Sequence, residues 1–232
     1  SNMKKITTIL AMLSALVVLT GTSAKALDIK TGLSLNSMGV VANAQEQLKD
    51  QGRVTNKTDA IATTFASAFV EISSDEMMGL GFGVSYAPEV VSLNDEERNI
   101  QVAVVETVVE TVSGATDSGL QKIAADVDDL VNIYVTLPVG TGAYVKAGYI
   151  MATLNTKENL ATGSQYPNVD MEGLSIGGGY EGELGNSMFW RAEGTYQHWD
   201  DIAASGSEAG TTGNVNKITA EIGGVTGSLS LG

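Results

Sequence analysis

Apolar and polar residues alternate along most of this chain, and this pattern predicts β-strands rather than helices. The first clear example holds apolar or threonine side chains at every second position: Leu27, Ile29, Thr31, Leu33 and Leu35. Successive side chains of a strand point to opposite faces, so each such segment has one apolar face and one polar face. The same period predicts eight strands, at residues 27–41, 61–72, 77–87, 127–137, 142–153, 171–183, 188–199 and 216–231.

The expected connections are of two kinds, and the two kinds alternate. Three are short and rich in turn residues, at 73–76, 138–141 and 184–186. Four are long and polar, at 42–60, 88–126, 154–170 and 200–215. All the long connections therefore fall at one end, as in outer-membrane barrels with short periplasmic turns and long external loops. Residues 102–112 repeat Val-Val-Glu-Thr, which is compatible with an amphipathic helix or a β-hairpin, and the β-branched residues favour strand. The segment is either an external contact surface or two further strands that make ten.

The hairpins around the short turns give the same division into faces. Pairing Tyr180 with Trp190, or Leu137 with Ala143, leaves one face apolar or small throughout. The last strand changes the parity of its apolar positions, and a β-bulge near residues 223–224 would explain that change.

The direction of the apolar face separates a soluble lipocalin-like barrel, or a β-sandwich, from a membrane barrel. Both signs of charge stand among small residues on the polar face, which suits a narrow lumen with paired charges; the expected network is Asp28, Lys30, Glu71, Lys146, Glu181, Arg191, Glu193 and Glu221. Aromatic residues stand on the apolar face near the strand ends, as two interfacial girdles require: Tyr86, Tyr180, Trp190 and Tyr196. We therefore expect an all-β fold, a closed antiparallel up-and-down transmembrane barrel with its apolar face outward.

The first 26 residues have the features of an export signal. A basic start at 3–5 and an apolar run at 6–19 precede a small-x-small site at 24–26, so we expect cleavage after Ala26. Ser1 and Asn2 are interpreted as the remnant of a cleaved tag. The barrel domain is then 27–232, located in the bacterial outer membrane.

Composition narrows the classes of function. The 232 residues carry a net charge of −14, and without the three lysines of the signal segment the charge is −17, which argues against nucleic acid as a partner. The chain contains no cysteine and a single histidine, which removes most combinations of nucleophile and base.

Several segments resemble the small eight-stranded outer-membrane barrels of the OmpX and opacity-protein type, and most closely the porin-like outer-membrane proteins of marine alphaproteobacteria. The resemblance covers residues 27–232 in order and is carried by segments 29–35, 83–88, 144–149, 158–163 and 177–180. It implies a barrel architecture, with outer-membrane lipid and the barrel-assembly machinery as partners. Such proteins usually end in an aromatic residue, whereas this chain ends in Leu231 and Gly232.

Candidate chemical sites are few. His198 stands near Asp200 and Asp201, and Asp126, Asp128 and Asp129 form an acidic group; we interpret the first as interfacial and the second as a solvated strand entry. We expect no enzyme activity and no catalytic, metal or cofactor site. The expected function is a structural or porin-like barrel with a charge-filled lumen; the alternatives are an adhesion barrel with an external partner at loop 88–126, or a lipocalin-like binder.

Overall fold

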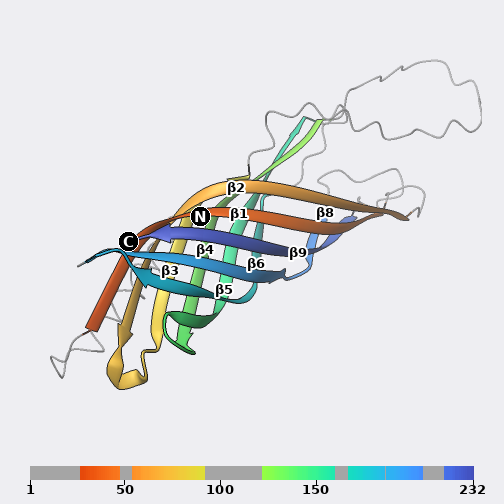
Figure 1. The fold of residues 1–232 in the computed structure, drawn as a ribbon. Helices are drawn as coiled ribbons and strands as arrows, with labels where there is room; N and C mark the ends of the chain where they lie inside the picture. Colours follow the sequence, from red (N-terminus) through yellow and green to blue (C-terminus); the bar gives the residue numbers. More distant parts are fainter. Residues whose placement is uncertain (1–26, 48–53, 92–121, 160–166, 186, 206–216) are drawn as a thin grey trace, which may run out of the picture.

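The described part of the chain forms one antiparallel sheet that closes on itself. The computed structural model describes residues 27–47, 54–91, 122–159, 167–185, 187–205 and 217–232. These residues form nine strands and one short 3-10 helix: β1 Leu27–Gln47, β2 Val54–Ser74, η1 Asp75–Met77, β3 Gly81–Val91, β4 Lys122–Pro138, β5 Ala143–Asn159, β6 Val169–Glu183, β7 Phe189–Trp199, β8 Ile202–Ser205 and β9 Lys217–Leu231. Strands β1 to β7 pair in order, β7 pairs with β9, and β9 pairs with β1, so the sheet is a barrel (Figure 1).

The short strand β8 shares one position in the barrel with β7. Strand β7 pairs with β9 as far as His198 and Gly223, and β8 resumes on β9 with Ile202 opposite Ala220. One extra residue on the β7–β8 side interrupts the ladder, as in a β-bulge. The described residues therefore form the predicted closed eight-stranded barrel. In this part of the chain, no helix is long and apolar enough to cross a membrane.

Several strands run further than the alternation predicts, and four of them do so by five residues or more. Strand β1 continues to Gln47 and β2 begins at Val54, although the prediction placed a loop at 42–60. Strand β4 begins at Lys122 and β5 continues to Asn159, into the predicted loop 154–170. Most residues in these extensions are polar, so the apolar face that marks a strand in the sequence is missing there.

Two predicted hairpin registers are wrong by two residues. Leu137 lies opposite Val145 rather than Ala143, and Trp190 lies opposite Gly182 rather than Tyr180. The apex of each turn is one residue later than predicted, and Gly142 takes a left-handed φ of 76° in the first of these turns. Because side chains alternate with a period of two, an error of two residues leaves every side chain on its predicted face.

The predicted bulge at residues 223–224 is absent. The ladder between β1 and β9 runs without a shift from Leu33 opposite Leu231 to Gln47 opposite Lys217. Strand β9 therefore keeps one parity, and its apolar residues Ile218 and Ile222 lie inside the barrel. Register shifts occur instead in β3 between Glu89 and Val91, and in β4 between Asp128 and Val131.

The apolar face points outward, and the polar face points into the lumen. Large apolar side chains are exposed on the outer face of β1, β5, β6, β7 and β9, among them Leu33, Leu35, Val145, Leu174, Ile176, Tyr196, Val225 and Leu229. Polar side chains are buried on the inner face, among them Asn36, Glu71, Thr136, Lys146, Ser175, Arg191, Gln197, Thr226 and Ser230. A lipocalin-like barrel would have the opposite arrangement, so the structure excludes that alternative.

Candidate functional site: the charged floor of the lumen

Charged side chains gather inside the barrel at the end that carries the short turns. Inward-facing positions of five strands supply them: Lys30 from β1, Glu71 from β2, Lys146 from β5, Glu181 from β6, and Arg191 and Glu193 from β7. We call these six residues the charged floor. They are three cations and three carboxylates, so the charges of the group cancel.

Arg191 is the centre of the charged floor. Its Nη1 lies 2.9 Å from Oε2 of Glu71 and its Nη2 lies 3.1 Å from Oε1, which is a bidentate ion pair across the lumen. The same guanidinium donates to Glu181 on the neighbouring strand, with 2.6 Å between Nη2 and Oε2. The side chains of Arg191 and Glu71 are 3% and 4% exposed, so this pair is almost completely removed from water.

Two lysines complete the pairing. Lys146 Nζ lies 2.8 Å from Oε1 of Glu193, whose Oε2 accepts a hydrogen bond of 2.6 Å from the Tyr144 hydroxyl. Lys30 Nζ lies 2.5 Å from Oε1 of Glu181, on the side of the group that is more open to solvent. Each carboxylate of the charged floor thus has a cationic partner.

Aromatic rings pack around these cations. The Arg191 guanidinium lies 5.0 to 5.6 Å from the ring centroids of Phe69, Tyr144 and Phe189. Lys146 Nζ lies 3.9 Å from the Tyr134 ring. Cation–π contacts of this kind add attraction where water is excluded, and the rings fill the space between the ion pairs.

Glycines opposite the large side chains make this packing possible. A Cβ atom added at Gly83 would lie 2.3 Å from Tyr134 Cζ, and one added at Gly179 would lie 2.6 Å from the Tyr144 hydroxyl. Real Cβ atoms do not approach so closely, so these positions need glycine for space rather than for conformation. The small residues beside charges in the sequence thus accommodate rings as well as ion pairs.

Two of the eight charged residues expected in the lumen lie outside this cluster. The Asp28 carboxylate lies 3.7 Å from Lys30 Nζ but is mostly exposed, at the edge of the floor. Glu221 is exposed, because the even-numbered positions of β9 face inward and it has the opposite parity. The expectation of Glu221 in the lumen depended on the bulge that the structure lacks.

Above the charged floor the lumen has a layer of uncharged polar side chains. Ser34 and Ser230 share a hydrogen bond of 2.7 Å, and Ser228 donates to Oδ1 of Asn36. A cavity of about 60 Å³ lies at this level and reaches down to Lys146 and Arg191. It has room for a few water molecules.

The outer half of the lumen is filled by apolar side chains. They come from all around the barrel and pack as one buried cluster: Met38, Phe65, Ala87, Val90, Leu130, Ile150, Ala152, Met171, Trp199 and Ile202. We call this cluster the apolar plug. The sequence prediction missed it, although Ile150 and Ala152 have the same parity as Lys146 and were identifiable as inward-facing.

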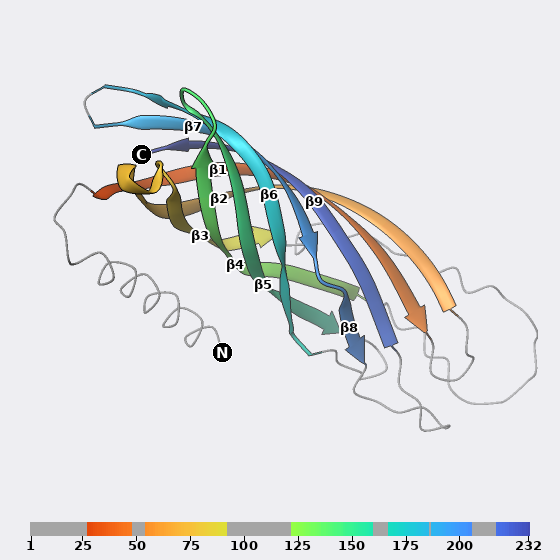
Figure 2. The ribbon, with the colours of Figure 1, turned by 90° about the horizontal axis from the view of Figure 1, so that it is seen from below.

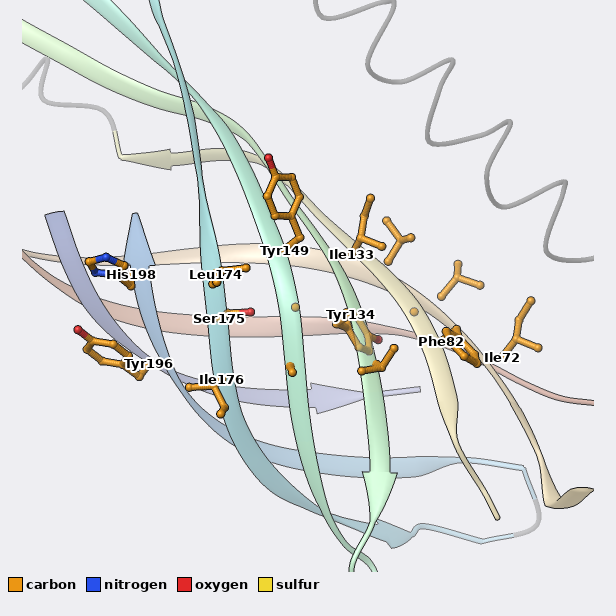
Figure 3. A pocket seen from close by; sticks show the side chains of 16 residues that line it. Ile72, Phe82, Ile133, Tyr134, Tyr149, Leu174, Ser175, Ile176, Tyr196 and His198 are labelled. Carbon is orange, nitrogen blue, oxygen red and sulfur yellow. The ribbon is translucent and has the colours of Figure 1, made fainter. Parts of the chain in front are cut away.

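The aromatic residues of the expected girdles lie on the outer face. Tyr180 and Trp190 are neighbours near the turns, with ring centroids 5.8 Å apart. Tyr86 lies at the other end and donates to Asp129 over 2.6 Å, and Tyr196 is exposed there. Figure 3 shows this outer face from close by, with Tyr149, Leu174, Ile176 and Tyr196 along it.

His198 also lies on this outer face, beside Tyr196 and away from the lumen. Asp200 donates its backbone N–H to the Glu172 carbonyl at the break between β7 and β8. Among the described residues, no group of three or more His, Asp or Glu side chains could hold a metal ion.

Comparisons with known proteins find similar solved structures. No protein-family model and no curated protein matches this chain. Similar solved structures include the outer membrane protein OprG from Pseudomonas aeruginosa, with 14% identity over 87% of this chain and 96% of that chain and a TM-score of 0.42. The outer membrane protein AlkL in lipid bilayers has 14% identity over 91% of this chain and 94% of that chain, with a TM-score of 0.37. Neisserial surface protein A has 10% identity over 83% of this chain and 95% of that chain, with a TM-score of 0.32.

At these identities and TM-scores the comparisons say nothing about a ligand or a partner. The geometry of the chain itself carries the assignment of its fold. The sheet is closed and antiparallel, its outer face is apolar, and its interior holds paired charges. This chain has the fold of the small eight-stranded outer-membrane β-barrels.

Proposed function

We propose that this chain is a structural outer-membrane β-barrel that contacts lipid with its apolar face and conducts no large solute. Support for the membrane location comes from the outer face, where apolar side chains are exposed on several adjoining strands. Soluble monomers rarely expose contiguous apolar patches of more than a few hundred Å². A hydrocarbon layer would instead stabilise such a surface.

Strand lengths agree with a single crossing of the bilayer. Apart from the short β8, which continues the position of β7, the shortest barrel strands are β3 and β7, with 11 residues each. A tilted transmembrane strand needs about 9–11 residues, so these two strands are just long enough to span.

The observation that carries the proposed closed state is the filling of the lumen at two successive levels. The charged floor occupies the turn end through buried ion pairs, and the apolar plug fills the opposite half. The cavity of about 60 Å³ between them is far too small for a continuous path for solutes. Eight-stranded barrels generally have interiors just wide enough for side chains, in agreement with this packing.

Single-channel recording in a planar bilayer tests the closed state. The mature chain, residues 27–232, is refolded and inserted, and its insertion is checked by the resistance of the folded band to detergent before boiling. We expect no stable conductance steps, because neither level leaves a continuous water path. Sustained open steps from inserted wild-type protein would overturn the proposal.

A second proposed function is contact with external surfaces, and it rests on the long hairpin β1–β2. Both strands have 21 residues, about ten more than a crossing needs, and β9 stays paired with β1 as far as Gln47 opposite Lys217, so this side of the barrel extends further than a crossing requires (Figures 1 and 2). The cross-strand pair Thr58 and Asn43 is hydrogen-bonded at 2.8 Å and exposed, so this region presents polar groups to water.

Shortening the hairpin tests this second function. Cells that display a chain with residues 44–57 replaced by a short Gly-Ser turn should adhere less to hydrophilic surfaces than cells with the full chain. Equal adhesion at equal surface amounts of protein would remove the support for it. The other proposed contact surface, loop 88–126, has residues 92–121 outside the described part of the chain.

A further inference from the structure

Exposed apolar side chains stand on each of the short turns at one end of the barrel. Met78 in the β2–β3 turn is 83% exposed, Val139 in the β4–β5 turn is 60% exposed, and Met188 before β7 is 55% exposed. Met77 and Leu184 are exposed beside them. Turns that face water usually carry polar residues, so a repeated apolar residue on separate hairpins needs an explanation.

These turns form one ordered rim. A Cβ atom added at Gly79 would lie 2.9 Å from Pro138 Cγ, so the β2–β3 turn packs against the β4–β5 turn. Leu184 donates its backbone N–H to the Met188 carbonyl over 2.8 Å, which holds the β6–β7 turn closed. Figure 2 shows η1, the β4–β5 turn and the C-terminus at the same end of the barrel.

The apolar rim is continuous with the outer face that we propose to contact lipid. Leu137 is exposed beside the β4–β5 turn, and Ile29 and Leu231 are exposed at the same end of the barrel, near the start of β1 and at the end of β9. Trp190, which packs against Tyr180, lies two residues above Met188. Two residues of strand span about 7 Å, and one headgroup layer of a bilayer is roughly 5–7 Å thick. With Trp190 at the inner edge of that layer, Met188 lies within it.

We infer that the rim inserts Met78, Val139 and Met188 into the headgroup layer of the periplasmic leaflet, and that it favours zwitterionic phospholipid there. The preference for zwitterionic phospholipid is argued from the charge of the rim. Its exposed charged groups in the described residues are Asp28, Asp75 and Glu183, while Lys30 is paired with Glu181. Exposed carboxylates repel anionic headgroups and attract the amines of zwitterionic ones. This inference rests on the proposed function, because it requires a barrel that spans the bilayer.

Site-directed spin labels test the insertion, and the absence of native cysteine makes each label unique. Labels are placed by Met78→Cys, Val139→Cys and Met188→Cys in the mature chain, refolded into vesicles of zwitterionic phospholipid. Accessibility to oxygen, which concentrates in lipid, is compared with accessibility to a water-soluble nickel chelate. Val145→Cys on the outer face and Ser205→Cys at the opposite end are the references for lipid and for water.

We expect the rim labels to be several-fold less accessible to the nickel chelate than the label at position 205. If they are as accessible as position 205 while position 145 is protected, the inference is wrong and the membrane barrel stands. If position 145 is also as accessible as position 205, the proposed function itself fails. In vesicles with half of the lipid anionic we expect the rim labels to be less protected from the nickel chelate than in zwitterionic vesicles. Equal or stronger protection in the half-anionic vesicles would overturn the proposed preference for zwitterionic lipid.

Discussion

Removal of Arg191 should destabilise the barrel more than removal of any other charge of the charged floor. The substitution Arg191→Met keeps most of the side-chain volume and leaves Glu71, 4% exposed, without its bidentate partner. Breaking a buried ion pair by removing one partner costs about 3–5 kcal/mol, because the remaining charge is buried and unpaired. The substitution also removes the contacts of the guanidinium with three aromatic rings.

A second substitution should recover part of this loss. Glu71→Gln removes the stranded charge, and the remaining four charges, Lys30 with Glu181 and Lys146 with Glu193, stay paired. Glu181→Gln should recover less, because Glu71 then remains buried without Arg191. We therefore expect the double variant with Glu71→Gln to be more stable than Arg191→Met alone, with a coupling of about 1–3 kcal/mol.

Equilibrium unfolding by urea in lipid vesicles measures these differences, with the fluorescence of Trp190 and Trp199 as the signal. Lys30→Met is the control: Lys30 is 24% exposed, and an ion pair this open to solvent contributes about 1 kcal/mol or less. Additive losses for Arg191→Met and Glu71→Gln would refute the reasoning, because residues that do not interact show no coupling.

Three further outcomes follow from the same structure. The folded chain of residues 27–232 should migrate differently in a detergent gel before and after boiling, and identical migration would contradict closure of the barrel. Gly83→Ala should destabilise by about 1–3 kcal/mol in the same urea titration because its Cβ meets Tyr134, whereas Gly194→Ala, with nothing within 4 Å, should be neutral. Ile150→Ala should cost about 2–5 kcal/mol because Ile150 is fully buried in the apolar plug, and a loss below 1 kcal/mol would show that the plug is loosely packed.

The faces of the strands were predictable from the sequence because the membrane and the lumen impose opposite polarity on alternate residues. Lys146 and Val145 were assigned to opposite faces, and the structure places them so. This assignment survived register errors of two residues, since the period of the side chains is also two. The apex of the β4–β5 turn was not predictable, because it depends on which of Gly140 and Gly142 takes a left-handed φ, and only Gly142 does so.

The apolar plug and the partners of Arg191 depend on contacts across the barrel. Apolar residues inside the lumen, such as Ile222, look in the sequence like lipid-facing residues of shifted parity, which is why a bulge was expected there. Glu71 and Arg191 are 120 positions apart in sequence, and local spacing says nothing about their meeting. The apolar plug and the Glu71–Arg191 pair could therefore be recognised only once the strands were placed in the closed barrel.

A nitroxide scan along β5, from position 143 to position 150, tests most directly that one face of each strand contacts lipid and the other faces a packed lumen. In vesicles, the odd positions should be accessible to oxygen and protected from a water-soluble nickel chelate, whereas the even positions, including Tyr144, Lys146 and Ile150, should be poorly accessible to both. A period of two in oxygen accessibility is the predicted result. Odd positions as accessible to the nickel chelate as a free label in water would contradict the account.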